Sequence, residues 1–137
     1  MPTLGRVIES SLYVDDLDRA GRFYEDVLGL AVLTRDSRFR AYDVGGQTVL
    51  LIFKRGATLE TVHMPGGTIP PHGGSGSLHV AFAIGTEELA EWEKRLASHG
   101  IEIEGRTKWA RGGNSIYFRD PDGHLLELAT PGLWATY

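Results

Sequence analysis

Short segments in which apolar residues mostly alternate with polar ones recur along the 137-residue chain, and this pattern predicts β-strands. Such segments lie at residues 6–14, 30–34, 38–44, 77–84, 101–108 and 115–118. An apolar run lies at 48–53, and a second apolar strand, with one charge in it, lies at 125–128. Gly45-Gly46 and Asp120-Pro121-Asp122-Gly123 separate neighbouring segments and are typical of turns. The last turn, with the segments on either side, predicts a β-hairpin over residues 114–130.

Two other segments carry apolar residues at helical spacing. The first stripe contains Leu17, Ala20, Phe23, Tyr24 and Leu28, and the second contains Leu89, Trp92, Leu96 and Ala97. Asp16 is the expected N-cap of the first helix and Thr86 that of the second, because a side-chain oxygen there accepts an otherwise unpaired backbone N–H. Glycines at 29 and 100 are expected to end the two helices.

The two halves of the chain have the same order of elements: strand, helix, strand, strand, strand. Aligning Glu9 with His79 brings both first strands, both helices and both final turns into register, which indicates an internal duplication. The pattern predicts an α+β fold in which two tandem βαβββ modules form a curved, partly closed mixed sheet around a cleft. In a single domain over 1–137, the modules are expected at 5–53 and 77–130. The Gly- and Pro-rich residues 54–76 are expected to be a linker or a lid.

Composition narrows the functional classes. The net charge of −4 argues against a nucleic-acid partner, and no apolar run is long enough to cross a bilayer. The chain has no cysteine, which excludes disulfides and thiolate metal sites and fits a cytoplasmic location. The exposed sheet edges expected of two small modules favour a homodimer, in which halves could be exchanged between chains.

One charge, Glu127, interrupts the apolar final strand. A carboxylate among leucines must face water, pair with a cation such as Arg40 or Arg119, or hold a metal ion, because unpaired burial is costly. The duplication places Glu9 and His79 at equivalent positions, while the equivalent of Glu127 is about Leu50, which cannot bind a metal. One imidazole and two carboxylates, from Glu9, His79 and Glu127, suit Mn²⁺, Fe²⁺, Ni²⁺, Co²⁺ or Zn²⁺.

Purely structural roles are the alternatives to metal binding. His79 could be a hydrogen-bonded strand histidine, and Tyr117 could be a packed ring or a proton donor. His63, His72, His99 and His124 are not expected to be metal ligands. Trp109 and Arg111 could line the mouth of a cleft. The tail Pro131–Trp134 is expected to pack through its apolar side chains.

Four motifs carry a resemblance to a known family. They are Leu12-Tyr13-Val14-Asp15-Asp16-Leu17, Phe23-Tyr24-Glu25-Asp26-Val27-Leu28-Gly29-Leu30, Leu78-His79-Val80-Ala81-Phe82, and Tyr117 through Gly123 with Leu126-Glu127-Leu128. Together they resemble the vicinal oxygen chelate superfamily, the group of glyoxalase I, fosfomycin-resistance proteins, bleomycin-resistance proteins and extradiol dioxygenases. The family's metal positions correspond to Glu9, His79 and Glu127; position 9 is commonly histidine there, so Glu9 is a departure.

The resemblance implies a small metalloenzyme in which a divalent ion chelates two neighbouring oxygens of a small-molecule substrate. A lyase, an isomerase and an extradiol-type dioxygenase all fit, with Glu127 and Tyr117 as the expected catalytic residues. The alternative is a metal-independent protein of the bleomycin-resistance type, which would sequester a flat or aromatic compound beside Trp109, Tyr117 and Phe39.

Overall fold

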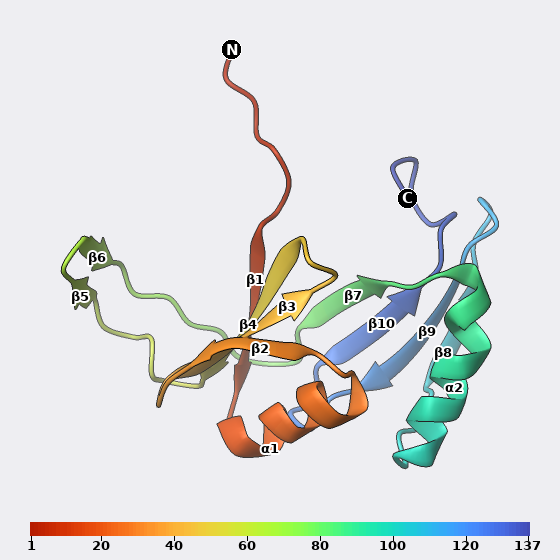
Figure 1. Ribbon diagram of the computed structural model, residues 1–137, viewed down its shortest axis with the longest axis horizontal. Coiled ribbons are helices and arrows are strands. Elements are labelled where there is room, and N and C mark those ends of the chain that lie inside the picture. The colour runs from red at the N-terminus through yellow and green to blue at the C-terminus, as the bar shows by residue number, and fades with distance from the viewer. The chain divides into compact units, whose positions relative to one another are not determined.

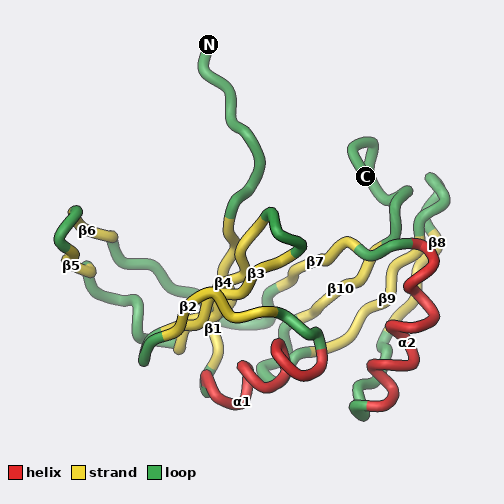
Figure 2. The backbone as a smooth tube through the Cα atoms, in the orientation of Figure 1, coloured by secondary structure: helices red, strands yellow, loops and turns green.

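The computed structural model describes all 137 residues, which form two compact units: unit 1, residues 1–75, and unit 2, residues 76–137. Figures 1 and 2 show the elements of each unit. Unit 1 contains β1 (Glu9–Val14), α1 (Leu17–Arg22), the π-helical turn η1 (Phe23–Val27), β2 (Ala31–Arg35), β3 (Phe39–Val44), β4 (Thr48–Lys54), β5 (Val62–Met64) and β6 (Gly67–Ile69). Unit 2 contains β7 (His79–Ala83), the 3₁₀ turn η2 (Thr86–Glu88), α2 (Leu89–Ser98), β8 (Gly105–Lys108), β9 (Asn114–Arg119) and β10 (Leu125–Ala129).

Each unit has one four-stranded sheet with the same internal order. The orders are β1-β4-β3-β2 and β7-β10-β9-β8, and in each sheet the first pair is parallel and the other two are antiparallel. The α+β class and the two βαβββ modules are therefore confirmed. The two sheets are separate, and both remain open.

Strand register shows which residues of the two modules are equivalent. Glu9 pairs with Val49 in the parallel pair of unit 1, as His79 pairs with Leu125 in unit 2. Glu127 lies two residues beyond Leu125, so its equivalent is Leu51, not Leu50 as the sequence alignment predicted. A shift of one residue moves a side chain to the other face of a strand. Leu51 has no ligand atom, so the corrected register still gives unit 1 no counterpart of Glu127.

The helical segment of unit 1 covers one face of its sheet. Asp16 is the N-cap as predicted: its Oδ1 accepts hydrogen bonds from the backbone N–H groups of Asp18 (2.9 Å) and Arg19 (3.0 Å), and the Arg19 bond lowers the pKa of the Asp16 carboxyl. The core beneath α1 and η1 comprises fully or nearly fully buried side chains of both helices and of β1 and β4, including Leu12, Val14, Tyr24, Leu50 and Ile52.

In unit 2 the helix begins later than predicted. Gly85 precedes the turn η2, Thr86 makes no side-chain cap, and α2 starts at Leu89. Leu96 is the buried residue of α2, opposite the sheet core of Ile116, Phe118, Leu126 and Leu128. The next strand also starts late, at Gly105, because the Ile101 N–H still donates to the Leu96 carbonyl and closes the end of the helix.

Residues 54–76 are more structured than a simple linker. They form an arm whose tip is the hairpin β5–β6, away from the four-stranded sheet of unit 1 (Figure 1). The returning chain, residues 70–74, is the strap. It is fixed by His72, whose backbone N–H donates to the Thr58 carbonyl (2.9 Å) and whose carbonyl accepts from Thr58 Oγ1 (2.6 Å).

Both ends of the chain depart from prediction. The first strand starts at Glu9 and not at Arg6, because the residues before it run past the start of β4 at Thr48. The C-terminal tail does not pack through Trp134, which is 68% exposed. Its anchor is Tyr137, whose hydroxyl donates to the Ala129 carbonyl (2.8 Å). None of the helices has the length and apolar character to span a bilayer.

Candidate functional site

Two of the predicted metal ligands lie together in unit 2. His79, the first residue of β7, is half exposed, whereas the Glu127 side chain on β10 is 6% exposed. His79 Nε2 lies 3.2 Å from Glu127 Oε1. The two predicted arginine partners of Glu127 bind elsewhere: Arg40 pairs with Asp18 and Arg119 pairs with Glu104.

The hydrogen bond on the other side of the His79 ring determines what Nε2 can do. Nδ1 lies 2.8 Å from the Leu125 carbonyl oxygen, and because a carbonyl only accepts, Nδ1 carries a proton. In the neutral ring Nε2 is then an unprotonated acceptor that faces the carboxylate, another acceptor. Such a pair requires a proton or a cation between its atoms. A histidine held through one nitrogen by a backbone carbonyl is the usual arrangement of a metal ligand.

The spacing of the pair also fits a metal ion. Ligand atoms bonded at about 2.1 Å in adjacent octahedral positions are separated by about 3.0 Å. The observed 3.2 Å between Nε2 and Oε1 is close to that edge. An imidazole nitrogen with a carboxylate oxygen is a donor set suited to Mn²⁺, Fe²⁺, Co²⁺, Ni²⁺ or Zn²⁺.

The second oxygen of Glu127 is fixed by neighbours from the β8–β9 region. Ser115 Oγ donates to Oε2 at 2.5 Å, and Trp109 Nε1–H donates to Ser115 Oγ at 2.8 Å. Ser115 is itself 1% exposed. This chain of bonds holds Oε2 and leaves Oε1 directed toward His79.

Tyr117 lies beside the pair. It is directly opposite Glu127 in the antiparallel β9–β10 register, and its ring centroid is 6.4 Å from that of His79. Burial raises the pKa of the Tyr117 hydroxyl, and the negative charge of Glu127 raises it further. The phenol therefore keeps its proton at neutral pH and can donate a hydrogen bond.

The third predicted ligand, Glu9, belongs to unit 1. It is the exposed first residue of β1. Neither unit by itself contains a cluster of three histidine, aspartate or glutamate side chains suited to a metal ion. The fully buried His124 has a positioning role, because its Nδ1 accepts the N–H of Leu78 (3.0 Å), immediately before the His79 that faces Glu127.

Unit 1 contains an aromatic pocket on the sheet face away from α1. Its volume is about 680 Å³, within the range of small-molecule sites. The pocket is lined by residues of β1, β3, β4, the arm and the strap, among them Tyr13, Phe39, Leu51, Phe53, Met64 and His72. Glu9 also lines it.

The strap is part of the wall of this pocket. His72 Nδ1 lies 2.7 Å from the Tyr13 hydroxyl, and its ring packs edge-on against Phe53 with 4.8 Å between centroids. The expectation that His72 is not a metal ligand stays a prediction. Its ring contacts Tyr13 and Phe53. It is bound to the sheet of its own unit.

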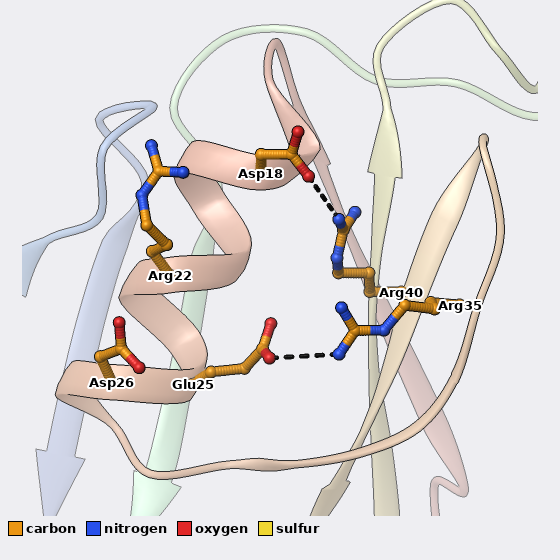
Figure 3. A pocket seen from close by; sticks show the side chains of 6 residues that line it. All are labelled: Asp18, Arg22, Glu25, Asp26, Arg35 and Arg40. Carbon is orange, nitrogen blue, oxygen red and sulfur yellow. Dashed lines mark hydrogen bonds and ion pairs between the residues drawn. The ribbon is translucent and has the colours of Figure 1, made fainter.

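A second, charged pocket of about 190 Å³ lies between α1–η1 and the strands of unit 1 (Figure 3). Asp18 and Glu25 extend from the helix toward Arg40 and Arg35, with ion-pair distances of 2.7 and 3.2 Å. Glu25 also accepts a hydrogen bond from the buried Tyr42 hydroxyl (3.0 Å). Because these side chains form ion pairs with one another, they hold α1 and η1 on the sheet.

Ser115 was missed as a site residue by sequence reasoning. The hairpin register contained the signal, because residue 115 shares a strand face with Tyr117, which is opposite Glu127. Trp109, which could line a cleft mouth, donates its indole N–H to Ser115.

Comparison with known proteins places these features in a family. The model of the Glyoxalase/Bleomycin resistance protein/Dioxygenase superfamily matches residues 4–128. The metallothiol transferase FosB of Staphylococcus saprophyticus is 30% identical over 118 residues, 85% of this chain and 71% of that protein. FosB of Staphylococcus epidermidis is 32% identical over 118 residues, 85% of this chain and 75% of that protein.

Solved structures agree with the sequence matches. A lactoylglutathione lyase from Agrobacterium tumefaciens has a TM-score of 0.88 and 31% identity, and the match covers 98% of this chain and 99% of that one. The fosfomycin resistance protein FosX from Listeria monocytogenes shares the fold, with a TM-score of 0.64, 24% identity, and coverage of 95% and 94%. The chain therefore belongs to the Glyoxalase/Bleomycin resistance protein/Dioxygenase superfamily, the vicinal oxygen chelate group that its motifs resemble.

Proposed function

We propose that this protein is a small metal-dependent enzyme whose divalent ion is bound by His79 and Glu127, with Glu9 as the third ligand. The observation that carries the proposal is the 3.2 Å approach of His79 Nε2 to Glu127 Oε1, which brings two acceptors together when the ring is in the neutral form set by the Leu125 carbonyl and so leaves a place for a cation between them. When bound, the ion supplies Lewis-acid polarisation of neighbouring substrate oxygens.

The residues of the chain have separate tasks in this proposal. The Leu125 carbonyl holds the His79 ring so that Nε2 is presented as a ligand. Ser115 holds Glu127 Oε2, so that Oε1 is the oxygen available to the ion. The Tyr117 phenol, protonated at neutral pH, donates a hydrogen bond to an oxygen of the substrate and stabilises negative charge that develops there.

The similar proteins favour some of the family's reactions over others. They include a metallothiol transferase and a lactoylglutathione lyase, and both names concern thiols or thiol adducts. We therefore favour a lyase, an isomerase or a thiol transferase acting on a small oxygen-bearing substrate over an extradiol dioxygenase.

Mn²⁺ titration tests the metal site directly. Free Mn²⁺ is followed by electron paramagnetic resonance on protein stripped with EDTA and dialysed. We expect one ion per site, and a loss of at least about 100-fold in affinity for His79→Ala and for Glu127→Gln. His99→Ala and Glu91→Gln, which change the same residue types elsewhere in unit 2, should bind as the wild type does.

A Glu9→Gln variant tests the third ligand separately. Reduced Mn²⁺ affinity in this variant would support a contribution from unit 1 of the same chain or of a partner copy. Unchanged affinity would remove Glu9 from the site. If wild-type protein binds no Mn²⁺, Zn²⁺ or Ni²⁺, the enzyme proposal is wrong.

A homodimer is part of the proposal. β1, β2, β7 and β8 are the edge strands of the two open sheets, and an edge with unpaired backbone groups is a template for a second copy. Equilibrium sedimentation should give twice the 15.0 kDa chain mass. A single 15.0 kDa species would contradict this.

The second candidate function is metal-independent binding of a flat compound. The aromatic pocket in unit 1 favours it, because its rings and volume suit a small planar molecule without any metal. A ligand-induced rise in melting temperature that persists in EDTA would support this function.

A further inference from the structure

The aromatic pocket of unit 1 has a charge pattern that the metal-site proposal accounts for only at Glu9. Three carboxylates line it, those of Glu9, Asp36 and Glu60, and all three residues are exposed. Only one guanidinium, that of Arg38, lines it as well. A ligand seated there meets an excess of negative charge, which favours a cation and disfavours an anion.

The walls of the pocket supply a second feature that suits a cation. Tyr13 and Phe53 are stacked with 6.1 Å between ring centroids, and Phe39 lies 5.6 Å from Phe53. The faces of aromatic rings carry negative electrostatic potential and attract positively charged groups, and they also stack on planar rings.

The pocket is bounded by structure and is more than an open sheet face. The strap closes one side, where His72 contacts both Tyr13 and Phe53. Val62, Met64 and Ile69 of the hairpin arm line another side. Met64 and Ile69 are 50% and 41% exposed, so they offer apolar surface that a ligand can cover.

We propose that the aromatic pocket binds a planar aromatic cation, through contact with the Tyr13, Phe39 and Phe53 rings that line it and attraction to Glu60 and Asp36. This inference specifies a ligand class for the metal-independent binding candidate and rests on that candidate. It does not depend on the His79–Glu127 pair, which belongs to unit 2.

Two three-ring fluorescent probes of opposite charge test the ligand class. One is 9-aminoacridine, a cation at neutral pH, and the other is anthracene-9-carboxylate, an anion. We expect the cation to bind at least about tenfold more tightly in EDTA, where no metal ion can occupy Glu9. Equal binding of the two probes would overturn the proposed ligand class while leaving the pocket as a binding site.

Variants separate this pocket from binding to the negative surface in general. Glu60→Gln should weaken 9-aminoacridine binding about two- to fivefold, whereas Glu91→Gln, with the same change in net charge but in unit 2, should have no effect. Phe39→Leu should weaken it about fivefold. Arg38→Gln should strengthen it about two- to fivefold, because it removes the opposing charge.

The outcomes distinguish this proposal from the metal-site proposal. If neither probe binds, or if Glu60→Gln and Glu91→Gln weaken the cation equally, the pocket proposal fails. The Mn²⁺ titration of His79 and Glu127 variants is unaffected by that result. If the probes behave as expected but Mn²⁺ does not bind, only the enzyme proposal fails. Melting temperatures of the variants show whether each one is folded.

Discussion

Unit 1 and unit 2 have the same strand order but differ, at equivalent positions of their two central strands, in which face of the sheet carries polar side chains. On the face away from the helix, unit 2 carries the paired residues Glu127 and Tyr117. The equivalent pair in unit 1 is Leu51 and Ala41. One module thus has a carboxylate and a phenol where the other has two apolar side chains.

The face beneath the helix shows the reverse arrangement. Unit 1 carries Tyr42 and Arg40 there, bonded to Glu25 and Asp18 of the helical segment. The equivalent residues of unit 2 are apolar: Phe118 and Ile116, both buried.

This difference between the modules shows that each copy of a duplicated sheet can carry a polar network on one face and still keep its core. Beneath the helix of unit 1, the network consists of internal ion pairs and fixes the packing of α1. On the open face of unit 2, one oxygen of Glu127 is held by Ser115 and the other faces His79, an arrangement that can accept a ligand. Variants at each face test this difference.

The largest effect is expected at the open face of unit 1, where Gly74 touches Tyr13. A Cβ at residue 74 would lie 2.5 Å from Tyr13 Cδ2 and 2.7 Å from Cε2. Gly74→Ala should therefore displace the strap or the ring and reduce the free energy of unfolding by about 1–3 kcal/mol. Urea denaturation measures the change.

A glycine in the same arm provides the control for Gly74. Gly66→Ala adds the same methyl group where no atom lies within 4 Å. It should leave the stability nearly unchanged. Equal effects of the two variants would show that the strap does not pack on Tyr13 in solution.

The charged network beneath α1 should give the next largest effect. Glu25→Ala leaves the fully buried Tyr42 hydroxyl without its acceptor and removes the partner of Arg35 (Figure 3). We expect a loss of about 1–2 kcal/mol in the free energy of unfolding, since Glu25 is partly exposed and its ion pair is screened. The double variant Glu25→Ala with Tyr42→Phe should be less destabilised than the sum of the two single variants.

The fold could be predicted from the hydrophobic pattern of the sequence, because the same local pattern of strands and helix occurs in both modules. The alternation in strands and the helical stripe of Leu17, Ala20 and Phe23 depend on residues close in sequence, and the structure agrees with them. Boundaries were less accurate where a helix-end hydrogen bond decides, as at Ile101, whose N–H donates to the Leu96 carbonyl, closes α2 and so delays β8.

The candidate site likewise contains residues that the sequence pattern could identify and residues that it could not. A charge among leucines marked Glu127, and the duplication aligned Glu9 with His79. The role of Ser115 could not be read from the hydrophobic pattern, because a serine on a strand gives no periodic signal. Only the hairpin register relates it to Glu127, twelve residues away. The arm hairpin β5–β6 was missed for a related reason: its strands are only three residues long and lie among glycines and prolines.

Ser115 offers a sharper test of the open face of unit 2. Ser115→Ala removes the donor to Glu127 Oε2 and the acceptor of the Trp109 indole, while both proposed ligands remain. We expect Mn²⁺ affinity to fall about tenfold, as for other residues that orient a metal ligand. Ser98→Ala, at the end of α2, should have no effect, and an unchanged affinity in Ser115→Ala would mean that the orientation of Glu127 is unimportant.

The smallest expected effect concerns the alkaline stability of unit 1. Burial and the hydrogen bond to Glu25 raise the pKa of Tyr42 well above its ordinary value. In the unfolded chain this tyrosine ionises near pH 10, so above that pH the unfolded state gains stability that the folded state does not share. The contribution of Tyr42 is therefore complete below about pH 10 and is lost as the pH rises toward its folded pKa. Tyr42→Phe should be slightly less stable than the wild type at pH 7, by about 1 kcal/mol or less, and should lose less stability between pH 9 and pH 11. Urea denaturation across that range measures both slopes, and parallel slopes would show that the Tyr42 hydroxyl is not protected beneath the helix.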